Sequence, residues 1–558
     1  MQSIAIIIHK TSNVLCERLL DNLSGINIPD GYQVDVIVME GAANRASAYN
    51  EAMHSSDAKY KIYMDESTII FNKNILNEII FIFLCNTDVG IIGLYGSEMP
   101  IDGDFFRSEN HYGIYGYSQD GEHVNLVKGK NPLWWQKVHC LDGALLATSV
   151  DIDWDEEVDD IFLPAAQCCR FRMKKYDIVV PMCNSIWCAF GKELSYSRKM
   201  LPESDAQKTF FERYKYIIQP LVSILITTYN QPLFFRQALE SALNQDYHNI
   251  EIVVGDDSTN TDTKKLMKGY LNQYKNIRYY YHNGPLGGFG RENMKFILNE
   301  CKGEYVNYLF HDDLFLPAKI SRMMAYYIKD LEGEIGIVTS ARNALDETGK
   351  FLGSMNRWLP DKDEFISANK MARGILETRS NYIGELTTVL LRKSLLKTKC
   401  GDFAAGVFAG IHDRAHGDVG TFLECARLGK KCVFINEVLS LFRVSSGQNS
   451  HNRTIIAHSL MEWLNYITIS WLNHIFVEDK KDLHHLYDLW KIATEKQIKA
   501  IKAVASNEIS ADEIVCLKAF NAAQHKDYKS LFDLSIKAIK SYDNNADVMD
   551  KWLLGSGC

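Results

Sequence analysis

Residues 252–259, with the sequence IVVGDDST, place two aspartates directly after a run of apolar residues. Residues 305–313, YVNYLFHDD, repeat this arrangement further along the chain. Apolar runs rich in β-branched and aromatic residues are typical of buried parallel strands, and the carboxyl ends of such strands form the crevice in which open α/β sheets bind ligands. Carboxylates collected there require a cation, and a divalent metal that carries a diphosphate would supply one.

The bulk composition indicates a globular protein of several domains. The chain has 558 residues, of which 46% are hydrophobic and 23% charged, and a chain of this length suggests roughly two to four domains. The net charge of -9 argues against a nucleic-acid-binding protein, because such proteins normally carry a basic surplus. The 13 cysteines are odd in number and lack metal-type spacing, so we expect free thiols in a reducing cytoplasm.

Neither a signal peptide nor a membrane span is expected from the sequence. Residues 1–9 resemble a first strand, and the apolar stretch at 79–84 is far shorter than the ~20 residues that cross a bilayer. The prediction is therefore a cytoplasmic protein with at most peripheral contact at the inner face of the membrane.

The two halves of the chain begin alike. Apolar strands are predicted at 3–8, 35–39 and 61–66, and again at 222–228, 250–254 and 305–312. Strands that alternate with helical patterns at this spacing predict α/β domains with mostly parallel sheets. Beyond residue 455 the pattern becomes helical, with Leu460, Leu464, Ile467 and Trp471 on one face. The predicted domains are 1–205, 216–455 and an all-helical region at 456–558.

The role of the helical region is left open by its sequence. It can be a dimerisation module that makes a homo-oligomer, an acceptor-docking module, or a cover for the preceding sheet.

The amino-acid sequence of residues 221–257 and 302–317 resembles that of family 2 glycosyltransferases with the GT-A fold. The resemblance covers residues 216–450, and residues 1–200 follow a more distant version of the same pattern. It implies two tandem GT-A domains, Rossmann-like and mostly parallel. It also implies an inverting, metal-dependent transfer of a hexosyl or N-acetylhexosaminyl group from a nucleotide-sugar such as a UDP-sugar. The implied acceptor is a hydroxyl of a glycan, lipid-linked saccharide or protein in bacterial surface glycan synthesis.

The resemblance assigns the nucleotide base to two turns of the second domain. Thr228, Tyr229 and Asn230 would lie against the base, and Asp256 or Asp257 would accept a hydrogen bond from its imide. Each group also has a structural reading, because Asn230-Gln231-Pro232 can build a simple turn and Asp256-Asp257-Ser258-Thr259 can cap a helix.

A glycine-rich segment at 284–290 is a third candidate for contact with the nucleotide. Arg291 and Asn293, which follow it, would face phosphate or ribose from the start of a helix. The alternative is a flexible surface loop.

The metal and the catalytic base are assigned in the same way. Asp312 matches the metal-binding position of the family's acidic triplet, with His311 or Asp313 assisting, while Phe310 replaces the usual first aspartate. The cofactor would be Mn²⁺ or Mg²⁺. Asp418 occupies the position of the base that deprotonates the acceptor. Helix capping is the structural alternative for both acidic positions.

The remaining assignments lie beside the acceptor and the diphosphate. Gly384, Glu385 and Thr387 fall where the acceptor enters, and Arg443 would pair with the diphosphate. The family often has a histidine where Ser445 stands, which leaves His451 as a substitute metal ligand.

The first domain is expected to be non-catalytic. Its metal-binding position falls at Ser67, and residues 162–167, where a base would lie, contain no acid. Loss of either group would cost several orders of magnitude in rate. Asp65 and Glu66 keep a catalytic role open.

Two other functions compete with the glycosyltransferase reading. A nucleotidyltransferase should carry a glycine-rich, lysine-bearing phosphate loop near the first strand, and residues 228–232 are not one. A non-catalytic nucleotide-sugar or glycan-binding scaffold would tolerate the replacement of Asp312 and Asp418.

Overall fold

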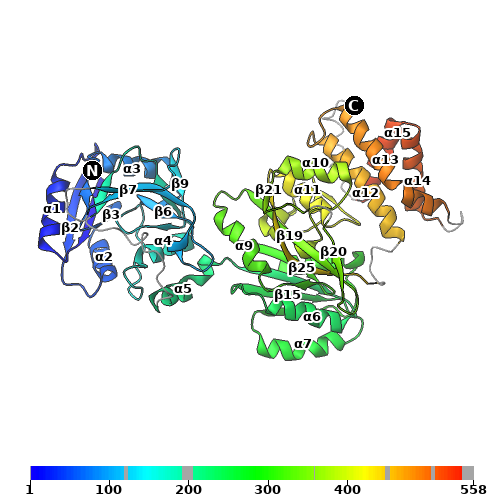
Figure 1. Ribbon diagram of the computed structural model, residues 1–558, viewed down its shortest axis with the longest axis horizontal. Helices are drawn as coiled ribbons and strands as arrows, with labels where there is room; N and C mark the ends of the chain where they lie inside the picture. The colour runs from blue at the N-terminus through cyan, green and yellow to red at the C-terminus, as the bar shows by residue number, and fades with distance from the viewer. Residues whose placement is uncertain are drawn as a thin grey trace. The chain divides into compact units, whose positions relative to one another are not determined.

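The computed structural model describes residues 2–118, 124–190, 205–356, 359–445, 453–503 and 509–542. The chain divides into two compact units, Met1–Gln219 and Pro220–Cys558. Each unit contains a mixed sheet, with parallel strands at its start and antiparallel strands added to them, and helices packed on it (Figure 1).

The first unit alternates strands and helices through most of its length. Its elements are β1 Gln2–His9, α1 Asn13–Ser24, β2 Tyr32–Met39, α2 Arg45–His54, β3 Tyr60–Asp65, β4 Ile69–Ile70, α3 Ile75–Cys85, β5 Val89–Gly93, β6 Tyr95–Ser97, β7 His111–Tyr117, β8 Asn125–Lys128, β9 Trp135–Lys137, β10 Cys140–Leu141, β11 Leu145–Thr148, α4 Leu163–Met173, β12 Asp177–Pro181, β13 Cys188–Phe190 and α5 Asp205–Ile218.

The main sheet of this unit has the order β2-β1-β3-β11-β5-β12-β9, with β2, β1 and β3 parallel. Residues 4–8 of β1 are fully buried, as expected of a strand covered on both faces. The unit extends past residue 205, where the sequence predicts its end, because α5 packs on α4. Phe210, Tyr214 and Ile218 of α5 share a core with Phe162 and Ala166.

The second unit follows the same plan and then continues into helices. Its elements are β14 Val222–Thr228, α6 Pro232–Leu243, β15 Ile250–Asp256, α7 Asp262–Gln273, β16 Ile277–Tyr281, α8 Arg291–Glu300, β17 Tyr305–Phe310, β18 Leu314–Phe315, α9 Lys319–Lys329, β19 Ile335–Leu345, β20 Phe351–Ser354, β21 Glu364–Ile366, α10 Ala368–Thr378, β22 Leu390–Arg392, β23 Val407–Phe408, β24 Ile411–His412, α11 Val419–Arg427, β25 Lys431–Arg443, α12 Arg453–Leu472, α13 Lys480–Lys502, α14 Ala511–Gln524 and α15 Tyr528–Tyr542.

The sheet of the second unit has the order β16-β15-β14-β17-β22-β19-β25-β18. The first four strands are parallel, and β22 joins them antiparallel. Helices α6 and α7 cover one face of the sheet, and α10 and α11 cover the other (Figure 1). This doubly covered α/β arrangement is the one that the sequence predicts for the second domain.

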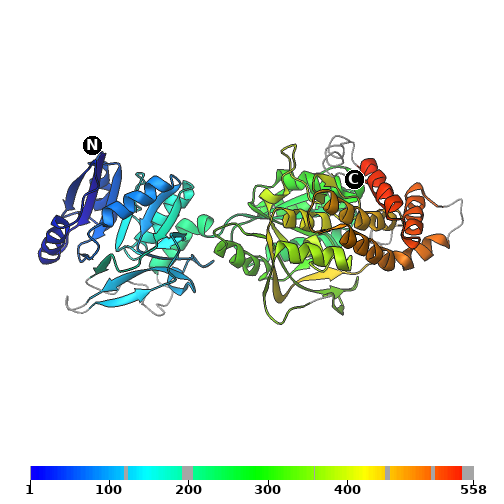
Figure 2. The ribbon, with the colours of Figure 1, turned by 90° about the horizontal axis from the view of Figure 1, so that it is seen from above.

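The four C-terminal helices pack on the α10–α11 side (Figure 2). Arg373 of α10 donates to Asp482 of α13 at 2.6 Å, and Trp490 Nε1 donates to the carbonyl of Leu460 at 2.8 Å. Their buried residues belong to one hydrophobic cluster that includes Leu225 and Val306 of the sheet. The region at 456–558 is therefore part of the second unit rather than a domain by itself.

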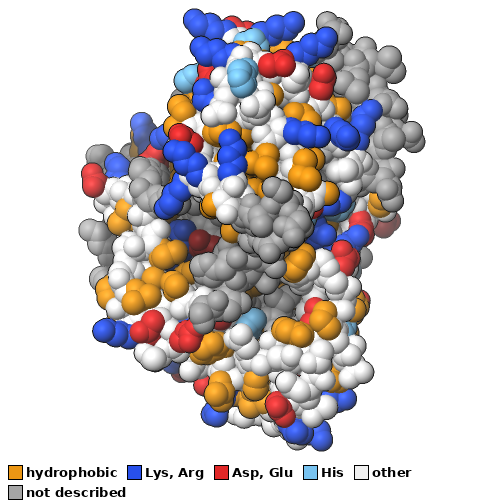
Figure 3. Space-filling view, turned by 90° about the vertical axis from the view of Figure 1, so that its right-hand side faces the viewer, with side chains coloured by type: hydrophobic (Ala, Val, Ile, Leu, Met, Phe, Trp, Pro, Cys, Tyr) orange, Lys and Arg blue, Asp and Glu red, His pale blue; other side chains and the backbone are white. Residues whose placement is uncertain are grey.

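The face of the second unit that Figure 3 shows mixes Lys and Arg with hydrophobic and acidic side chains. Among the described helices, none combines the length and the hydropathy needed to cross a bilayer.

Candidate active site

The carboxyl ends of β15, β14 and β17 meet at one edge of the second sheet. Asp256 pairs with Thr228, and Thr227 pairs with Phe310. Because parallel strands end in register, the turns that follow them are brought together. The predicted base-binding residues and His311-Asp312-Asp313 therefore lie at the same edge.

The two aspartates after β15 have different environments. Asp256 is fully buried, and its carboxylate accepts hydrogen bonds from the Ser258 amide at 2.9 Å and from the Tyr279 hydroxyl. Asp257 Oδ1 is buried without a hydrogen-bond partner among the described residues, and so is Thr228 Oγ1. Burial raises the pKa of Asp257. Of the two predicted acceptors, Asp257 is the one that can receive a hydrogen bond from a ligand.

Asn230 ties the turn after β14 to the turn after β15. Its backbone is left-handed, with φ 53°. Its N–H donates to Ser258 Oγ at 2.8 Å, and its Oδ1 accepts from the Thr259 amide at 3.0 Å. Tyr229, in contrast, is 46% exposed. The side chain of Asn230 thus shapes the turn, and Tyr229 is open to solvent.

The glycine-rich segment 284–290 requires glycine for its backbone. Gly284, Gly287, Gly288 and Gly290 all have φ between 59° and 132°, in the left-handed region. This conformation leads into α8, where Arg291 donates to the backbone carbonyl of Asp413. The loop is thereby joined to the segment that precedes Asp418.

Asn293 lies behind strand β15 instead of facing a ligand. It is 1% exposed, and its Nδ2 donates to the carbonyl of Gly255 at 2.9 Å. A Cβ atom at Gly255 would lie 1.9 Å from Asn293 Oδ1. The predicted contact of Asn293 with phosphate or ribose is corrected to a contact that supports the strand.

The carboxylates after β17 divide between an open and an anchored position. Asp313 is buried, and its oxygens accept from Thr387 Oγ1 at 2.6 Å and from the Arg443 amide at 3.0 Å. Burial raises its pKa well above the ordinary value. Asp312 is half-buried, and in the described part of the chain its carboxylate has no hydrogen-bond or ion-pair partner. The Asp312 carboxylate is therefore the one of the two that is open to a ligand, and Asp313 fixes the turn.

The set of oxygen ligands suits a metal that is held mainly by its substrate. The described residues contain no group of three or more His, Cys, Asp or Glu that could hold a metal ion, and His451 lies outside them. Mg²⁺ is commonly bound by one or two carboxylates together with substrate phosphates and water. Asp312 fits that pattern. His311 adjoins it, and burial lowers the pKa of its imidazole.

Arg443 does not face the open side of the site. It is 2% exposed, and its guanidinium donates to the carbonyls of Asp312 at 2.9 Å and Asp346 at 3.0 Å and to Gln237 Oε1 at 2.7 Å. It also lies 4.6 Å above the ring of Phe234. The expected pairing of Arg443 with a diphosphate is corrected to a role that holds the Asp312 backbone.

Asp418 stands at the start of α11, where the sequence places it. Its Oδ1 accepts from the Val419 amide at 2.8 Å, and its Oδ2 accepts from Asn381 Nδ2. Burial, with a smaller contribution from the charge of Glu385, raises its pKa to about 6. The carboxyl both caps a helix and remains suited to accept a proton near neutral pH.

The segment 381–388 connects the two acidic positions. Asn381, which holds Asp418, also bonds to the backbone of Gly384, and Thr387 holds Asp313. The charge of Glu385 raises the pKa of both Asp313 and Asp418. Arg342 pairs with Glu385 at 2.5 Å. The predicted acceptor-side residues thus lie between the turn that carries Asp313 and the start of α11 at Asp418.

Asn381 and Arg342 escaped prediction from the sequence. An asparagine in a loop and an arginine in a strand carry no motif, and each gains its role from a partner that folding brings close.

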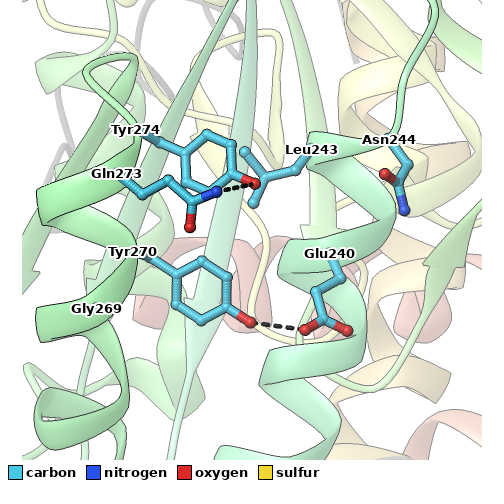
Figure 4. Close-up of a pocket in the computed structure, with 7 residues that line it drawn as sticks. All are labelled: Glu240, Leu243, Asn244, Gly269, Tyr270, Gln273 and Tyr274. Carbon is cyan, nitrogen blue, oxygen red and sulfur yellow. Dashed lines mark hydrogen bonds between the residues drawn. The ribbon is translucent and has the colours of Figure 1, made fainter.

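A cavity of about 510 Å³ lies between α6 and α7 (Figure 4). Its lining residues are Glu240, Leu243, Asn244, Gly269, Tyr270, Gln273 and Tyr274. They come from the C-terminal ends of the two helices. Because α6 begins directly after β14, its far end lies at the opposite edge of the sheet from the candidate site.

The corresponding edge of the first unit holds a cavity of about 170 Å³ lined in part by His9, Arg45 and Asp65. Its acids are engaged within the unit. Glu66 accepts from the amides of Thr11 at 2.8 Å and Ser12 at 2.9 Å, and Asp65 accepts from the Ser67 amide at 2.9 Å.

Both units match known protein families. Residues 5–214 match the model of a glycosyltransferase-like family, and residues 223–394 match the model of glycosyl transferase family 2. The chain carries two glycosyltransferase-family domains in tandem. The site at 228–443 lies mainly in the family 2 domain, while Asp418 and Arg443 lie beyond the matched residues.

Several curated glycosyltransferases are similar to parts of this chain. A glycosyltransferase of Rickettsia typhi is 40% identical over 188 residues, which are 33% of this chain and 54% of the relative. The GalNAc(5)-diNAcBac-PP-undecaprenol beta-1,3-glucosyltransferase of Campylobacter jejuni is 31% identical over 184 residues, 32% of this chain and 54% of that enzyme. The chain spans about half the length of these two relatives, and less of others.

Among solved structures, S. aureus TarS 1-349 in complex with UDP-GlcNAc aligns with a TM-score of 0.38 and 15% identity. The alignment covers 56% of this chain and 90% of that one.

Proposed function

We propose that the family 2 domain transfers a sugar from a nucleotide-sugar, which we propose to be a UDP-sugar, to an acceptor hydroxyl with inversion at the anomeric carbon. The observation that carries this proposal is the Asp418 carboxyl. It is held by Asn381 beside the acceptor segment, and its pKa is raised to about 6. A carboxylate with such a pKa is deprotonated at neutral pH and is still basic enough to accept a proton.

The donor would occupy the edge formed by β15, β14 and β17. The buried Asp257 Oδ1 and Thr228 Oγ1 lack partners among the described residues, and buried polar atoms normally have them. The imide N–H of uracil would donate to Asp257. The open Asp312 carboxylate would hold Mn²⁺ or Mg²⁺, which when bound neutralises the charge of the diphosphate.

The reaction then needs one proton transfer, from the acceptor hydroxyl to a residue of this chain. Asp418 would take the proton of the acceptor hydroxyl as the oxygen forms its bond to the anomeric carbon. The bond between that carbon and the diphosphate oxygen would break on the opposite face, which inverts the configuration. Asn381 would keep the accepting oxygen in place.

The acceptor is proposed to be a glycan or a lipid-linked saccharide of surface glycan synthesis. The Campylobacter jejuni relative is named for a lipid-linked acceptor. Peripheral contact with the inner face of the membrane would suit such an acceptor. The first domain would have a structural or acceptor-binding role, because Glu66 and Asp65 are engaged within it.

The test is a screen of sugar nucleotides for transfer and hydrolysis by the full chain, with Mn²⁺, with Mg²⁺ and with EDTA. We expect a UDP-sugar to be used, and NMR of the product to show the anomeric configuration opposite to that of the donor. Asp418→Asn should lower turnover by about 10²–10⁴-fold. Asp312→Asn should abolish the stimulation of turnover by Mn²⁺ or Mg²⁺.

The matched control is Asp262→Asn, which alters an exposed aspartate of α7 that pairs with Lys265 at 3.1 Å; its turnover should equal that of the wild type. Full cellular function in the Asp312→Asn, Asp418→Asn double variant would instead favour a non-catalytic binding scaffold. A preference for guanosine donors would contradict the assignment of Asp257.

A further inference from the structure

The loop 413–416, which leads into Asp418, is gripped by a carboxylate from the C-terminal helices. Glu462 of α12 is 2% exposed. Its two oxygens accept the N–H groups of three successive residues: Arg414, Ala415 at 2.8 and 3.0 Å, and His416 at 2.9 Å. Successive backbone N–H groups form a concave site for an anion. Here the anion is a side chain of this chain, 46 residues from His416.

The same face of α12 makes further contacts with His416, whose carbonyl also accepts from the Gly420 amide of α11 at 3.3 Å. Ser459 Oγ lies 2.6 Å from His416 Nε2, the Trp463 ring lies 4.9 Å from the imidazole, and Tyr466 donates to the His416 carbonyl at 3.4 Å. Residues 459, 462, 463 and 466 follow helical spacing, so they project from one side of the helix. One face of α12 thus contacts this loop.

The loop is also held by residues outside α12. Arg291, at the start of α8, donates to the carbonyl of Asp413, and the Asp413 amide donates to the Gly406 carbonyl at 2.8 Å. The loop is therefore fixed from both sides just before the helix that Asp418 begins. A shift of the loop would move the start of α11 and with it the carboxylate of Asp418.

We propose that Glu462 is a positioning residue, through which the C-terminal helices hold the loop 413–416 and so aim Asp418. This inference rests on the proposed function for the role of Asp418. It assigns to the helical region a part in the reaction, beyond covering the sheet. Glu462 itself acts through the loop and touches no reacting atom.

The test compares Glu462→Gln with the wild-type full-length chain. Glutamine keeps the size of the side chain but offers one accepting oxygen in place of two. We expect amide hydrogen exchange in 414–416 to become at least about tenfold faster. Turnover should fall about 10- to 100-fold, with the affinity for UDP, measured by calorimetry with Mn²⁺, unchanged within twofold.

Glu462→Asp should give intermediate exchange and intermediate turnover, because it restores both oxygens on a shorter arm. Glu513→Gln is the matched control. Glu513 is buried in α14, and its carboxylate accepts from the Ser510 amide at 2.8 Å within its own helix cap. It should leave exchange in 414–416 and turnover as in the wild type.

Unchanged exchange in 414–416, or faster exchange with full turnover, would overturn the proposal, as would an equal loss of turnover in Glu513→Gln. If Glu462→Gln does not fold, Ser459→Ala and Glu462→Asp decide, and wild-type exchange and turnover in both would overturn it. A wild-type chain that transfers no sugar would refute the proposed function, whereas the exchange experiment still reports on the contact between Glu462 and the loop.

Discussion

Asn381 donates from a single side-chain nitrogen to both Asp418 Oδ2 and the carbonyl of Gly384, the latter at 2.7 Å. The residue therefore links the proposed base to the segment where the acceptor is expected. Because a carboxylate that is free to rotate spends less time in a reactive geometry, this contact should affect the rate more than it affects binding.

Asn381→Ala should lower kcat about 10- to 100-fold and leave the affinity for UDP unchanged. Steady-state kinetics and calorimetry measure the two quantities. Asn299→Ala is the matched control, since Asn299 also bonds to backbone groups, at Phe403, away from the site. Equal losses of kcat in the two variants would show that Asn381 acts only on stability.

The raised pKa of Asp418 predicts a pH dependence of both rate and stability. As a base, Asp418 must be deprotonated, so kcat should fall as the pH drops through about 6. Its pKa in the folded state lies above the ordinary value of 3.8, so the folded state binds the proton more tightly than the unfolded state. Its contribution to stability is then fully present below pH 3.8 and is lost as the pH rises through about 6.

Asp418→Asn should therefore raise the free energy of unfolding relative to the wild type at pH 7.5. At about 1.36 kcal/mol per pKa unit, the gain is at most about 3 kcal/mol. The gain should shrink as the pH falls from 6 toward 4. Chemical denaturation at several pH values gives the comparison, and a variant less stable than the wild type at pH 7.5 would contradict the raised pKa.

Arg443→Lys separates support of the backbone from contact with the donor. Lysine cannot replace the planar set of donors that bonds to Asp312, Asp346 and Gln237. We expect a loss of about 2–4 kcal/mol in the free energy of unfolding, because buried carbonyls lose their partners. UDP affinity with Mn²⁺ should fall less than in Asp312→Asn. A stable variant with more than a tenfold loss of UDP affinity would instead restore the direct contact with diphosphate.

Asp142 of the first unit provides a pH prediction away from the candidate site. It is 3% exposed, and burial raises its pKa to about 8. A raised pKa in the folded state stabilises the fold below pH 3.8, and this contribution is lost as the pH rises through about 8. Asp142→Asn should make the first unit more stable than in the wild type at pH 9, with little difference at pH 4. Hydrogen exchange of β6 and β10 against pH provides the measurement.

Several features of the fold follow from local pattern. The apolar runs that end at Asp256 and at His311 predicted strands β15 and β17, because four to six buried β-branched and aromatic residues fit little else. The helical spacing of Leu460, Leu464 and Ile467 predicted α12 for the same reason. Asp312 and Asp418 were predicted because the residues around them match the metal-binding and base positions of family 2 glycosyltransferases.

The side chains that hold these acids could not be found in this way. From the sequence, Arg443 resembles a phosphate ligand. In the structure its guanidinium donates a hydrogen bond to Gln237, 206 residues away. From the sequence, Asn293 resembles a ligand-binding residue at a helix start. In the structure its side chain donates to the carbonyl of Gly255. Glu462 looks like one charged residue of an amphipathic helix until three backbone amides are found around it.

The sequence by itself determined the order of strands and helices, the two glycosyltransferase-family domains and the positions of Asp312 and Asp418, because hydrophobic periodicity and short motifs depend on neighbours along the chain. Only the tertiary structure decided which polar side chains are available to a ligand and which are bound within the protein. A buried polar atom must find a partner, and that partner is chosen by proximity in space, which folding creates between residues far apart in the chain.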